Sequence, residues 1–258
     1  MLFVNQAIRD PEVNALVTGG SRGIGRAIVL KMVREGYNCV FTYADNKEAA
    51  NETLRVARKI DSNIQIEAHL MDQGYIEQVE RVSNDIFESF GTIEVLVNNA
   101  AVNCNNAIAF MADEQWDKVI RTNLSGPFYL IRQFVMHMVG NRFGRIINIS
   151  SLAEDGASGQ AGYAASKGGL VALSKTVARE YGLKGITCNV VTVGLVETEL
   201  TSDQLSERLK SVWLEYCPVG RIGEADEIAD AVHYLTTEKA GFINGEIIKV
   251  TGGLTYVP

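Results

Sequence analysis

A tyrosine and a lysine four residues apart have the types and spacing for proton chemistry. Tyr163 and Lys167 occur in the run GYAASK, and on a helix residues i and i+4 lie on one face, one turn apart. A free phenol has a pKa near ~10, and a fixed positive charge beside it favours the phenolate and lowers that pKa. The pair therefore predicts a general acid/base, although a solvated lysine beside a half-buried tyrosine gives the same spacing.

A glycine-rich turn supplies a second candidate site. The apolar run Ala15–Val17 leads into TGGSRGIG, from Thr18 to Gly25, and a helical pattern follows. Glycines allow a sharp turn and a close approach to a pyrophosphate, and the new helix offers free N–H groups and the positive end of its dipole. This order predicts a dinucleotide site with the spacing Thr-Gly-x-x-x-Gly-x-Gly, in which Gly19 and Gly23 precede Gly25.

Apolar runs of strand length alternate with helical patterns along the whole chain. The expected strands are Ala15–Val17, Cys39–Thr42, Ile64–Leu70, Val95–Val97, Arg145–Ile149, Thr187–Val191 and Ile247–Val250. The expected helices are Gly25–Glu35, Lys47–Ile60, Ile76–Phe90, Glu114–Met138, Gly162–Tyr181 and Asp226–Thr236. Continuously apolar strands are typical of a parallel sheet covered on both faces. The pattern predicts a doubly wound α/β fold of about seven strands with helices on both faces.

Composition narrows the class of protein. The chain has 258 residues, of which 47% are hydrophobic and 21% charged, and its net charge is −7. This balance favours one globular domain over residues 1–258, with an N-terminal extension (1–12), a mainly dinucleotide-binding part (13–110) and a mainly catalytic part (111–258). It offers no basic face for nucleic acid and argues against attraction to anionic lipid. No apolar run is long enough to span a membrane.

The cysteines and histidines favour a reducing compartment and no metal. The four cysteines and three histidines are scattered, without a Cys-x-x-Cys motif, at Cys39, Cys104, Cys188, Cys217, His69, His137 and His233. Such cysteines are typical of buried free thiols. Since the N-terminus also lacks the layout of a signal peptide, a cytoplasmic protein is expected.

Taken together, the motifs resemble those of the short-chain dehydrogenase/reductase family. Besides the glycine turn and Tyr163-x-x-x-Lys167, the chain has NNAA from Asn98, a lone Asn123 in TNLSG, and INISS ending at Ser151, all in the family's order. The resemblance runs from about Asn14 to the C-terminal VTGG, and the whole pattern looks most like bacterial 3-oxoacyl-[acyl-carrier-protein] reductases. It implies a nicotinamide-dependent oxidoreductase.

The resemblance implies a role for each of four catalytic residues. Tyr163 would give a proton to a carbonyl oxygen during reduction, and Lys167 would lower its pKa and bind the nicotinamide ribose. Ser151 would hold the substrate oxygen, and Asn123 would hold a water that relays protons to Lys167. Ser150 competes with Ser151, because the family's usual spacing to Tyr163 is 13 residues; alignment from the strand favours Ser151, since a one-residue slip turns the hydroxyl away.

Two positions bear on the nucleotide. Users of NAD need a carboxylate after the second strand, and that charge repels a 2′-phosphate. Tyr43 stands at the matching position, Asp45 follows, and Arg22 can pair with a phosphate. NADP(H) is therefore expected, with NAD(H) as the alternative if Asp45 turns inward. The cofactor contacts that the resemblance implies are Gly19, Ser21, Arg22, Gly23, Ile24, Gly25, Tyr43, Asp72, Asn98, Ala100, Tyr163, Lys167, Val196 and Thr198.

The substrate is the least constrained part of the prediction. Arg142 and Lys184 match basic positions of the carrier-protein reductases, and they are expected beside the cleft, where an acidic acyl carrier protein would dock. A free small ketone, a sugar or a polyketide-like alcohol is the alternative substrate, and a non-catalytic nucleotide-binding scaffold is a remote one. The resemblance also implies a homotetramer. Val193 replaces the family's proline before Gly194, which frees the backbone and predicts a more mobile loop over the nicotinamide.

Overall fold

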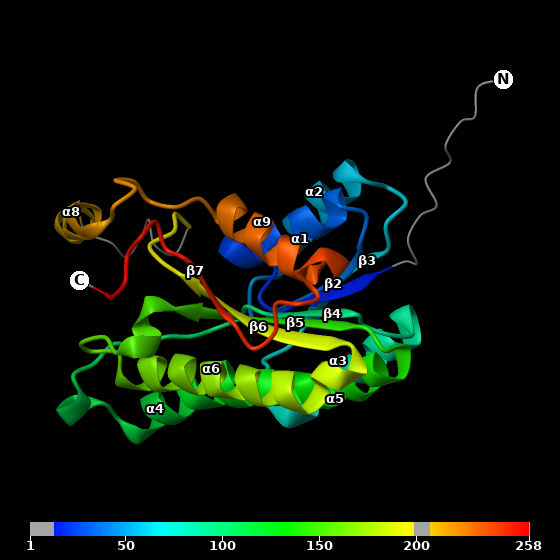
Figure 1. Cartoon of the computed structure of the whole chain (residues 1–258), viewed down its shortest axis with the longest axis horizontal. Helices are drawn as coiled ribbons and strands as arrows, with labels where there is room; N and C mark the ends of the chain where they lie inside the picture. Colours follow the sequence, from blue (N-terminus) through cyan, green and yellow to red (C-terminus); the bar gives the residue numbers. More distant parts are fainter. Residues whose placement is uncertain (1–12, 199–206, 258) are drawn as a thin grey trace.

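Seven parallel strands form one sheet at the centre of the molecule (Figure 1). The structure is a computed structural model and describes residues 13–198 and 207–257. The strands are β1 (Asn14–Val17), β2 (Asn38–Tyr43), β3 (Ile66–Leu70), β4 (Val95–Asn98), β5 (Gly144–Ser151), β6 (Ile186–Val193) and β7 (Ile247–Val250). Their order is β3-β2-β1-β4-β5-β6-β7, and every adjacent pair is parallel. All seven strands therefore end at the same edge of the sheet.

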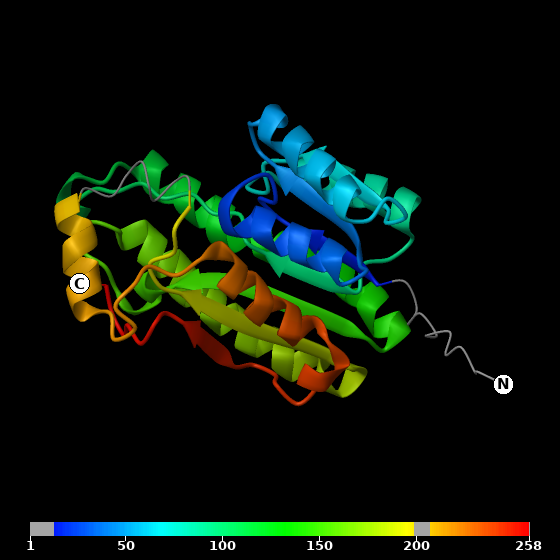
Figure 2. The ribbon, with the colours of Figure 1, turned by 90° about the horizontal axis from the view of Figure 1, so that it is seen from above.

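Helices cover both faces of this sheet. They are α1 (Gly23–Arg34), α2 (Lys47–Ile60), α3 (Ile76–Phe90), α4 (Asp113–Ile120), α5 (Gly126–Asn141), α6 (Ala161–Tyr181), α8 (Glu207–Tyr216) and α9 (Ala225–Thr236). Figure 1 shows α1, α2 and α9 on one face and α3, α4, α5 and α6 on the other, and Figure 2 looks onto the first of these layers. Two apolar cores result, one between each helical layer and the sheet. The predicted doubly wound fold is confirmed.

The alternation of side chains along the central strands explains these two cores. Val17 and Val97 point into the core beneath α1 and α9, whereas Leu16 and Leu96 point into the core beneath α3 and α5. All four side chains are fully buried. A strand buried on both faces reads as a continuous apolar run, which is why these strands were visible in the sequence.

The longest predicted helix is interrupted. The expected single helix Glu114–Met138 consists of α4, a five-residue π-helical segment Arg121–Ser125, and α5. A π segment inserts one extra residue per turn and is common at functional sites. Asn123 lies within it and is almost fully buried. Periodicity misses such a segment because the apolar pattern continues through it.

Strands β5 and β6 run further than predicted. Strand β5 continues to Ser151, and β6 continues to Val193, where the two residues pair directly. Val193 also pairs with Val250 of β7, and Gly194 donates its N–H to the carbonyl of Val250 at 3.2 Å. A proline at 193 would lack the N–H that a strand needs. Val193 therefore lengthens the sheet by its pairing with Val250, and the mobility of the loop that follows stays a prediction.

The topology reverses between β1 and β4. The chain proceeds from β1 to β2 and β3 in one direction and then returns to place β4 on the other side of β1. The crevice outside the carboxyl ends of such strands is where open α/β sheets bind ligands. The glycine-rich turn follows β1, and the NNAA motif follows β4, so both predicted motifs border this crevice. Within the described part of the chain, no helix is both long and apolar enough to cross a membrane.

Candidate active site

The turn between β1 and α1 is shaped for glycine. Gly19 and Gly23 have φ angles of +67° and +54°, a region that side chains with a Cβ rarely adopt. A Cβ on Gly25 would collide with the carbonyl oxygen of Gly19, and one on Gly20 would lie 2.5 Å from Phe41. Helix α1 has no capping side chain and no acidic residue in its first turn. Its free N–H groups and dipole suit an anion.

A second motif braces this turn. The hydroxyl of Thr18 accepts hydrogen bonds from the backbone N–H groups of Asn99 and Ala100 at 3.0 and 2.9 Å. In return, the Asn99 amide donates to the carbonyl of Thr18 at 2.8 Å and to that of Gly19 at 3.3 Å. The loops after β1 and β4 are thus joined at the place where the strand order reverses. Thr18 and Asn99 are structural members of the site that were not assigned a role from the sequence, although both lie inside the predicted motifs.

Tyr163 and Lys167 lie one turn apart on α6, at the carboxyl edge of the sheet. The Lys167 ammonium nitrogen is 5.5 Å from the centre of the Tyr163 ring. It donates a hydrogen bond of 2.7 Å to the carbonyl oxygen of Ile149 in β5. The Lys167 side chain is only 3% exposed, so the charge it carries lies inside the protein, with one hydrogen bond to the described residues.

The electrostatics of this pair differ from the prediction. Burial raises the pKa of Tyr163, and a hydrogen bond with Ser151 opposes that effect. Burial also lowers the pKa of Lys167 to about 8, against the negative charge of Glu154, which raises it. The expected lowering of the Tyr163 pKa by Lys167 is therefore wrong for the chain alone. The physical reason is desolvation, which disfavours both the phenolate and the ammonium.

The two candidate serines face different partners. Ser151 acts on the phenol of Tyr163 and opposes the rise of its pKa, whereas Ser150 is 1% exposed and donates to the Glu154 carboxylate at 2.5 Å. Their positions on β5 explain the difference, because successive side chains of a strand point to opposite faces. The geometry therefore brings Ser151, and not Ser150, to the tyrosine.

Buried amides hold α6 in place on the sheet. Asn98 of β4 donates to the side-chain oxygen of Asn148 of β5 at 2.8 Å, and Asn148 donates to the Ser174 hydroxyl of α6 at 2.8 Å. All three side chains are at most 2% exposed. Asn98 thus serves the sheet at this point, and its own oxygen has no partner among the described residues.

Asn123 is also held, by the loop after β4. Its side-chain oxygen accepts from the N–H of Val102, and its amide donates to the carbonyl of Val102, both at 2.8 Å. The second amide hydrogen goes to Ser166, at 3.2 Å, and Ser166 donates to the carbonyl of Tyr163 at 2.7 Å. The Asn123 side chain therefore links the π segment to α6, and its hydrogen-bonding capacity is used within the protein.

Comparison with known proteins agrees with this geometry. The family model described as Enoyl-(Acyl carrier protein) reductase matches residues 19–255. The chain belongs to the short-chain dehydrogenase/reductase family. Proteins named 3-oxoacyl-[acyl-carrier-protein] reductase FabG are 40% identical in both Staphylococcus aureus strain Mu50 (93% of this chain, 97% of that protein) and Salmonella typhimurium strain LT2 (94% and 97%). A solved structure named levodione reductase has a TM-score of 0.88 at 27% identity, covering 95% of this chain and 98% of that one.

Membership of the short-chain dehydrogenase/reductase family makes the chain an oxidoreductase with a nicotinamide cofactor. The residues present fit such a group. The crowded turn at Gly19 and Gly25 excludes side chains and leaves its backbone open to a pyrophosphate. Thr198, in the segment after β6, approaches Gly23 from across the crevice, and its methyl carbon would lie 3.4 Å from a Cβ at Gly23. The cofactor supplies the hydride; the protein supplies binding, orientation and the proton.

The positions that bear on the nucleotide are split between core and surface. Tyr43 ends β2 and packs in the core under α1, while Asp45 is exposed. Arg22 precedes α1 and is exposed, and within the described residues its guanidinium makes no hydrogen bond or ion pair. A carboxylate is thus missing from the end of β2, and a cation is available beside the turn.

The remaining predicted contacts surround the same crevice. Ser21 is buried, and its carbonyl accepts from Thr53 of α2 at 3.0 Å. Asp72 follows β3 and accepts from the N–H of Gly74 at 2.9 Å. Val196 is buried and bridges to Gly223. Ile24 and Ala100 border the turn itself, the first in the opening turn of α1 and the second on Thr18.

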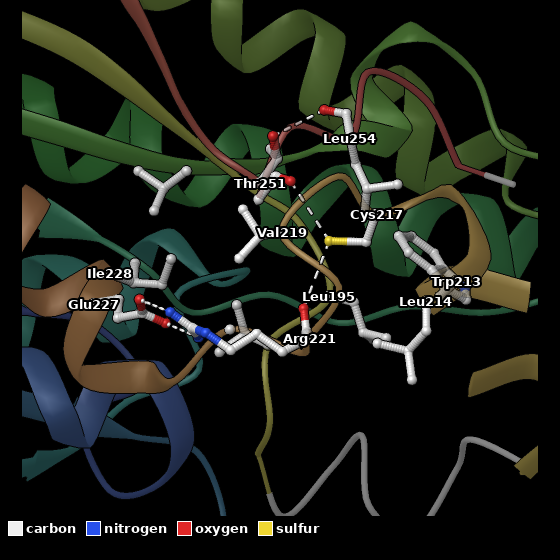
Figure 3. Close-up of a pocket in the computed structure, with 14 residues that line it drawn as sticks. Leu195, Trp213, Leu214, Cys217, Val219, Arg221, Glu227, Ile228, Thr251 and Leu254 are labelled. Atoms are coloured by element: carbon white, nitrogen blue, oxygen red, sulfur yellow. Dashed lines mark hydrogen bonds and ion pairs between the residues drawn. The ribbon is translucent and has the colours of Figure 1, made fainter. Parts of the chain in front are cut away.

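A pocket of about 100 Å³ lies beyond the ends of β6 and β7 (Figure 3). Its walls come from the segment after β6, from α8 and α9, and from the C-terminal turn, and Val196 is one of them. The Cys217 thiol points inward, with its sulfur 3.5 Å from the carbonyl oxygens of Arg221 and Gly252. Arg221 in turn pairs with Glu227 at 2.6 Å. The pocket therefore adjoins the segment that the resemblance assigns to the carboxamide.

Two predicted partner residues lie elsewhere. Arg142 precedes β5 and Lys184 precedes β6, and both are exposed. Strand β5 has eight residues, so Arg142 is about 23 Å or more from Ser151 at ~3.3 Å per residue. The expectation that these cations lie beside the cleft is wrong for a single chain. They border the opposite edge of the sheet, where Arg142 lines a hollow together with the buried Arg145.

Proposed function

We propose that this oxidoreductase uses NADPH to reduce a 3-oxoacyl thioester, carried by an acyl carrier protein, to the 3-hydroxy product. The observation that carries the proposal is that Tyr163, on which Ser151 acts, lies beside the buried Lys167 at the sheet edge that bears the glycine turn. The two relatives named 3-oxoacyl-[acyl-carrier-protein] reductase support the substrate class, since each is matched over 97% of its length.

Tyr163 is suited to act as the acid. Because burial raises its pKa, the phenol carries its proton at neutral pH and can donate it to a carbonyl oxygen as that oxygen gains charge. Ser151 shares a hydrogen bond with the phenol, so a substrate oxygen seated between the two hydroxyls would receive two hydrogen bonds. An acid placed in this way contributes roughly 10²–10⁴-fold to a rate.

Lys167 would favour the phenolate that proton donation leaves behind. An ammonium with a pKa of about 8 is mostly protonated at pH 7, and its two remaining hydrogens can serve the tyrosine oxygen and a ribose hydroxyl. Because both amide hydrogens of Asn123 are donated to Val102 and Ser166, its side chain has no hydrogen left to give to a water, and a water that returns protons to Lys167 would be bound as a donor or by the main chain of the π segment.

The choice of NADP(H) rests on charge. Arg22 offers an unpaired guanidinium beside the phosphate turn, and Tyr43 occupies the place where a carboxylate would reject a 2′-phosphate. A guanidinium recognises a phosphate through two parallel hydrogen bonds. The exposed Asp45 is two residues further on, and if it turned toward the ribose it would favour NAD(H) instead.

A carrier protein would use a second chain. If its acidic surface meets Arg142 and Lys184, the acyl arm cannot enter the site at the opposite edge of the same sheet, so it would have to enter the site of a neighbouring subunit. The homotetramer that we propose from the family resemblance would provide one. The arrangement therefore links the carrier hypothesis to assembly.

A free small ketone is the second candidate substrate. The structural relative named levodione reductase is 27% identical and aligns over nearly the whole chain, and Arg142 and Lys184 do not flank the cleft of the single chain. A small neutral substrate needs neither a carrier protein nor basic residues beside the cleft. Salt separates the two hypotheses, because a carrier bound through charged groups weakens with ionic strength.

The test measures NADPH oxidation by the full-length protein from the absorbance at 340 nm. The substrates are a 3-oxoacyl carrier protein, the matching free thioester, and a panel of small ketones and sugars. The carrier substrate should react fastest and lose activity steeply with salt. A Tyr163→Phe variant should bind NADPH normally and turn over about 10²–10⁴-fold more slowly. Equal turnover by the variant, or preference for a small ketone, would refute the corresponding part of the proposal.

A further inference from the structure

A carboxylate sits among the residues just described without a part in the proposed chemistry. Glu154 lies in the short 3-10 turn Leu152–Asp155 that follows β5. One of its oxygens accepts from the Ser150 hydroxyl at 2.5 Å, and the Thr192 hydroxyl donates to both, at 2.9 and 3.0 Å. The Ser150 distance is in the range typical of a hydroxyl group on a charged carboxylate. Glu154 therefore stands as a fixed negative charge.

The two donors hold this charge at a defined place. Ser150 and Thr192 are directly paired across β5 and β6, and their side chains are 1% and 0% exposed. Such rigid, buried donors fix the carboxylate more closely than a surface contact would, since neither hydroxyl can move away from the sheet. The turn also packs on α6, where the Glu154 carbonyl would lie 3.3 Å from a Cβ at Gly168.

This place is beside the buried lysine. Ser150, which donates to Glu154, directly follows Ile149, whose carbonyl accepts from Lys167. The Lys167–Glu154 separation exceeds the 4.0 Å of a direct ion pair in the described residues, so the two charges act on one another through a poorly solvated interior. A charge at that range has an effect inside a protein that it would lose in water.

We propose that Glu154 is a positioning residue that, clamped by Ser150 and Thr192, keeps the buried ammonium of Lys167 protonated. The inference rests on the proposed role of Lys167 in proton transfer. Without the negative charge of Glu154, desolvation would act on Lys167 unopposed and would favour the neutral amine over the ammonium that its role requires. Glu154 itself does not touch the reacting atoms and acts only through Lys167.

Other ionisable groups do not replace Glu154. Tyr163 shares the helix and is uncharged at neutral pH, and the facing ends of β5 and β6 carry only hydroxyl and apolar side chains. Asp155 turns to the surface, where it pairs with Lys249 of β7 at 3.7 Å. The other elements packed on α6 are α4, the π segment, α5 and the turn Gly182–Lys184. Their charged or titratable groups include Asp113, Glu114, Asp117, Lys118, Arg121, Arg132, His137 and Lys184. Of all these groups, only Glu154 exerts a resolved charge effect on Lys167.

The charge of Glu154 sets the direction in which the titration of Lys167 should move. The pKa of Lys167 is already lowered to about 8 by burial, and Glu154 raises it. Removing the negative charge should lower the midpoint further, so that the ammonium is lost at a lower pH. A Glu154→Gln change suits this test because glutamine is isosteric and can still accept a hydrogen bond from one hydroxyl and donate to the other.

The experiment titrates Lys167 directly and does not need turnover. Protein labelled with ¹³C at the lysine ε carbons is followed by NMR from pH 6 to 11, and the Lys167 signal is assigned by its absence in Lys167→Met. In Glu154→Gln the midpoint should move to lower pH by at least about half a unit. Asp155→Asn is the matched control: it removes the same charge from the next residue and should leave the midpoint unchanged.

Two results would overturn the inference: a Glu154→Gln midpoint equal to that of the wild type, or equal shifts in Glu154→Gln and Asp155→Asn. If Glu154→Gln does not fold by circular dichroism, Glu154→Ala removes the same charge and carries the same expectation. The high-pH limb of the NADPH oxidation rate is a second readout and should move in the same direction. An absence of turnover would count against the proposed function alone, because the NMR titration still reports on Glu154.

Discussion

The two edges of the sheet handle buried charge in different ways. At the carboxyl edge, Lys167 has a single carbonyl partner and a carboxylate nearby that hydroxyl groups hold in place. At the amino edge, Arg145 is equally buried but donates to the carbonyl oxygens of Gly144, Gly185 and Thr237 and lies over the Phe143 ring at 4.2 Å. In the described residues, no carboxylate lies within 4 Å of it.

The difference separates a structural cation from a reactive one. A guanidinium stays charged under all ordinary conditions, so carbonyl dipoles suffice to hold Arg145. An amine can lose its proton, so the charge state of Lys167 depends on its surroundings. The buried lysine at the carboxyl edge can therefore change its protonation, whereas the buried arginine at the amino edge cannot. Substitutions at the two edges should have unequal consequences.

The largest difference is expected between two glycines. Gly25→Ala at the carboxyl edge forces its Cβ against the Gly19 carbonyl, which should shift the turn, cost about 1–3 kcal/mol of stability and weaken both NADPH and NADH by roughly 100-fold. Gly140→Ala in α5 meets no atom within 4 Å and should be neutral or stabilising by about 0.5–1 kcal/mol. Urea unfolding and nucleotide fluorescence titrations measure both. Comparable losses in the two variants would contradict the role of the turn.

A smaller and more selective effect is expected at Arg22. Removing its guanidinium should weaken NADPH about tenfold or more, as the loss of one charge-assisted hydrogen bond implies, and should leave NADH nearly unchanged. Arg34→Ala, at the other end of α1, removes the same charge away from the crevice and serves as the control. Dissociation constants for both nucleotides give the answer, and an equal loss for NADH and NADPH would refute the assignment of NADP(H).

The smallest effect is expected at the amino edge. Replacing Arg142 and Lys184 by alanine together should raise the KM for a carrier-bound substrate about 3- to 10-fold at low salt, with no change for the free thioester. A double variant of two exposed α6 residues, Lys175→Ala with Arg179→Ala, matches the loss of charge. Should the first pair leave the carrier KM unchanged, or raise that of the free thioester equally, the proposed docking surface would be wrong.

The sequence predicted the fold because every central strand is buried on both faces. Val17 and Val97 sit in continuous apolar runs, and the turn glycines follow them directly, so periodicity and motif agree. The pairing of Tyr163 with Lys167 was equally accessible, since one helical turn brings them together. These features depend on short stretches of chain, which is why residue spacing was sufficient.

Features that depend on distant residues were not predicted. The π segment around Asn123 arises from tertiary contacts with Val102, which lies 21 residues away. The raised pKa of Tyr163 and the lowered pKa of Lys167 follow from burial, and burial is a property of the packed molecule. Glu154 reads in the sequence as an ordinary loop acid, because nothing in the chain indicates that its partners would be Ser150 and Thr192.

The buried amides between the sheet and α6 fix the position of the helix along the strands. If α6 slid by one residue along the sheet, Ser174 would leave Asn148, and the Asn148 amide would lose a partner deep inside the protein. Each buried polar group left alone costs about 1–3 kcal/mol. The helix is thereby indexed to the strands, and Tyr163, eleven positions upstream of Ser174, is returned to the same place opposite Ser151 each time the chain folds.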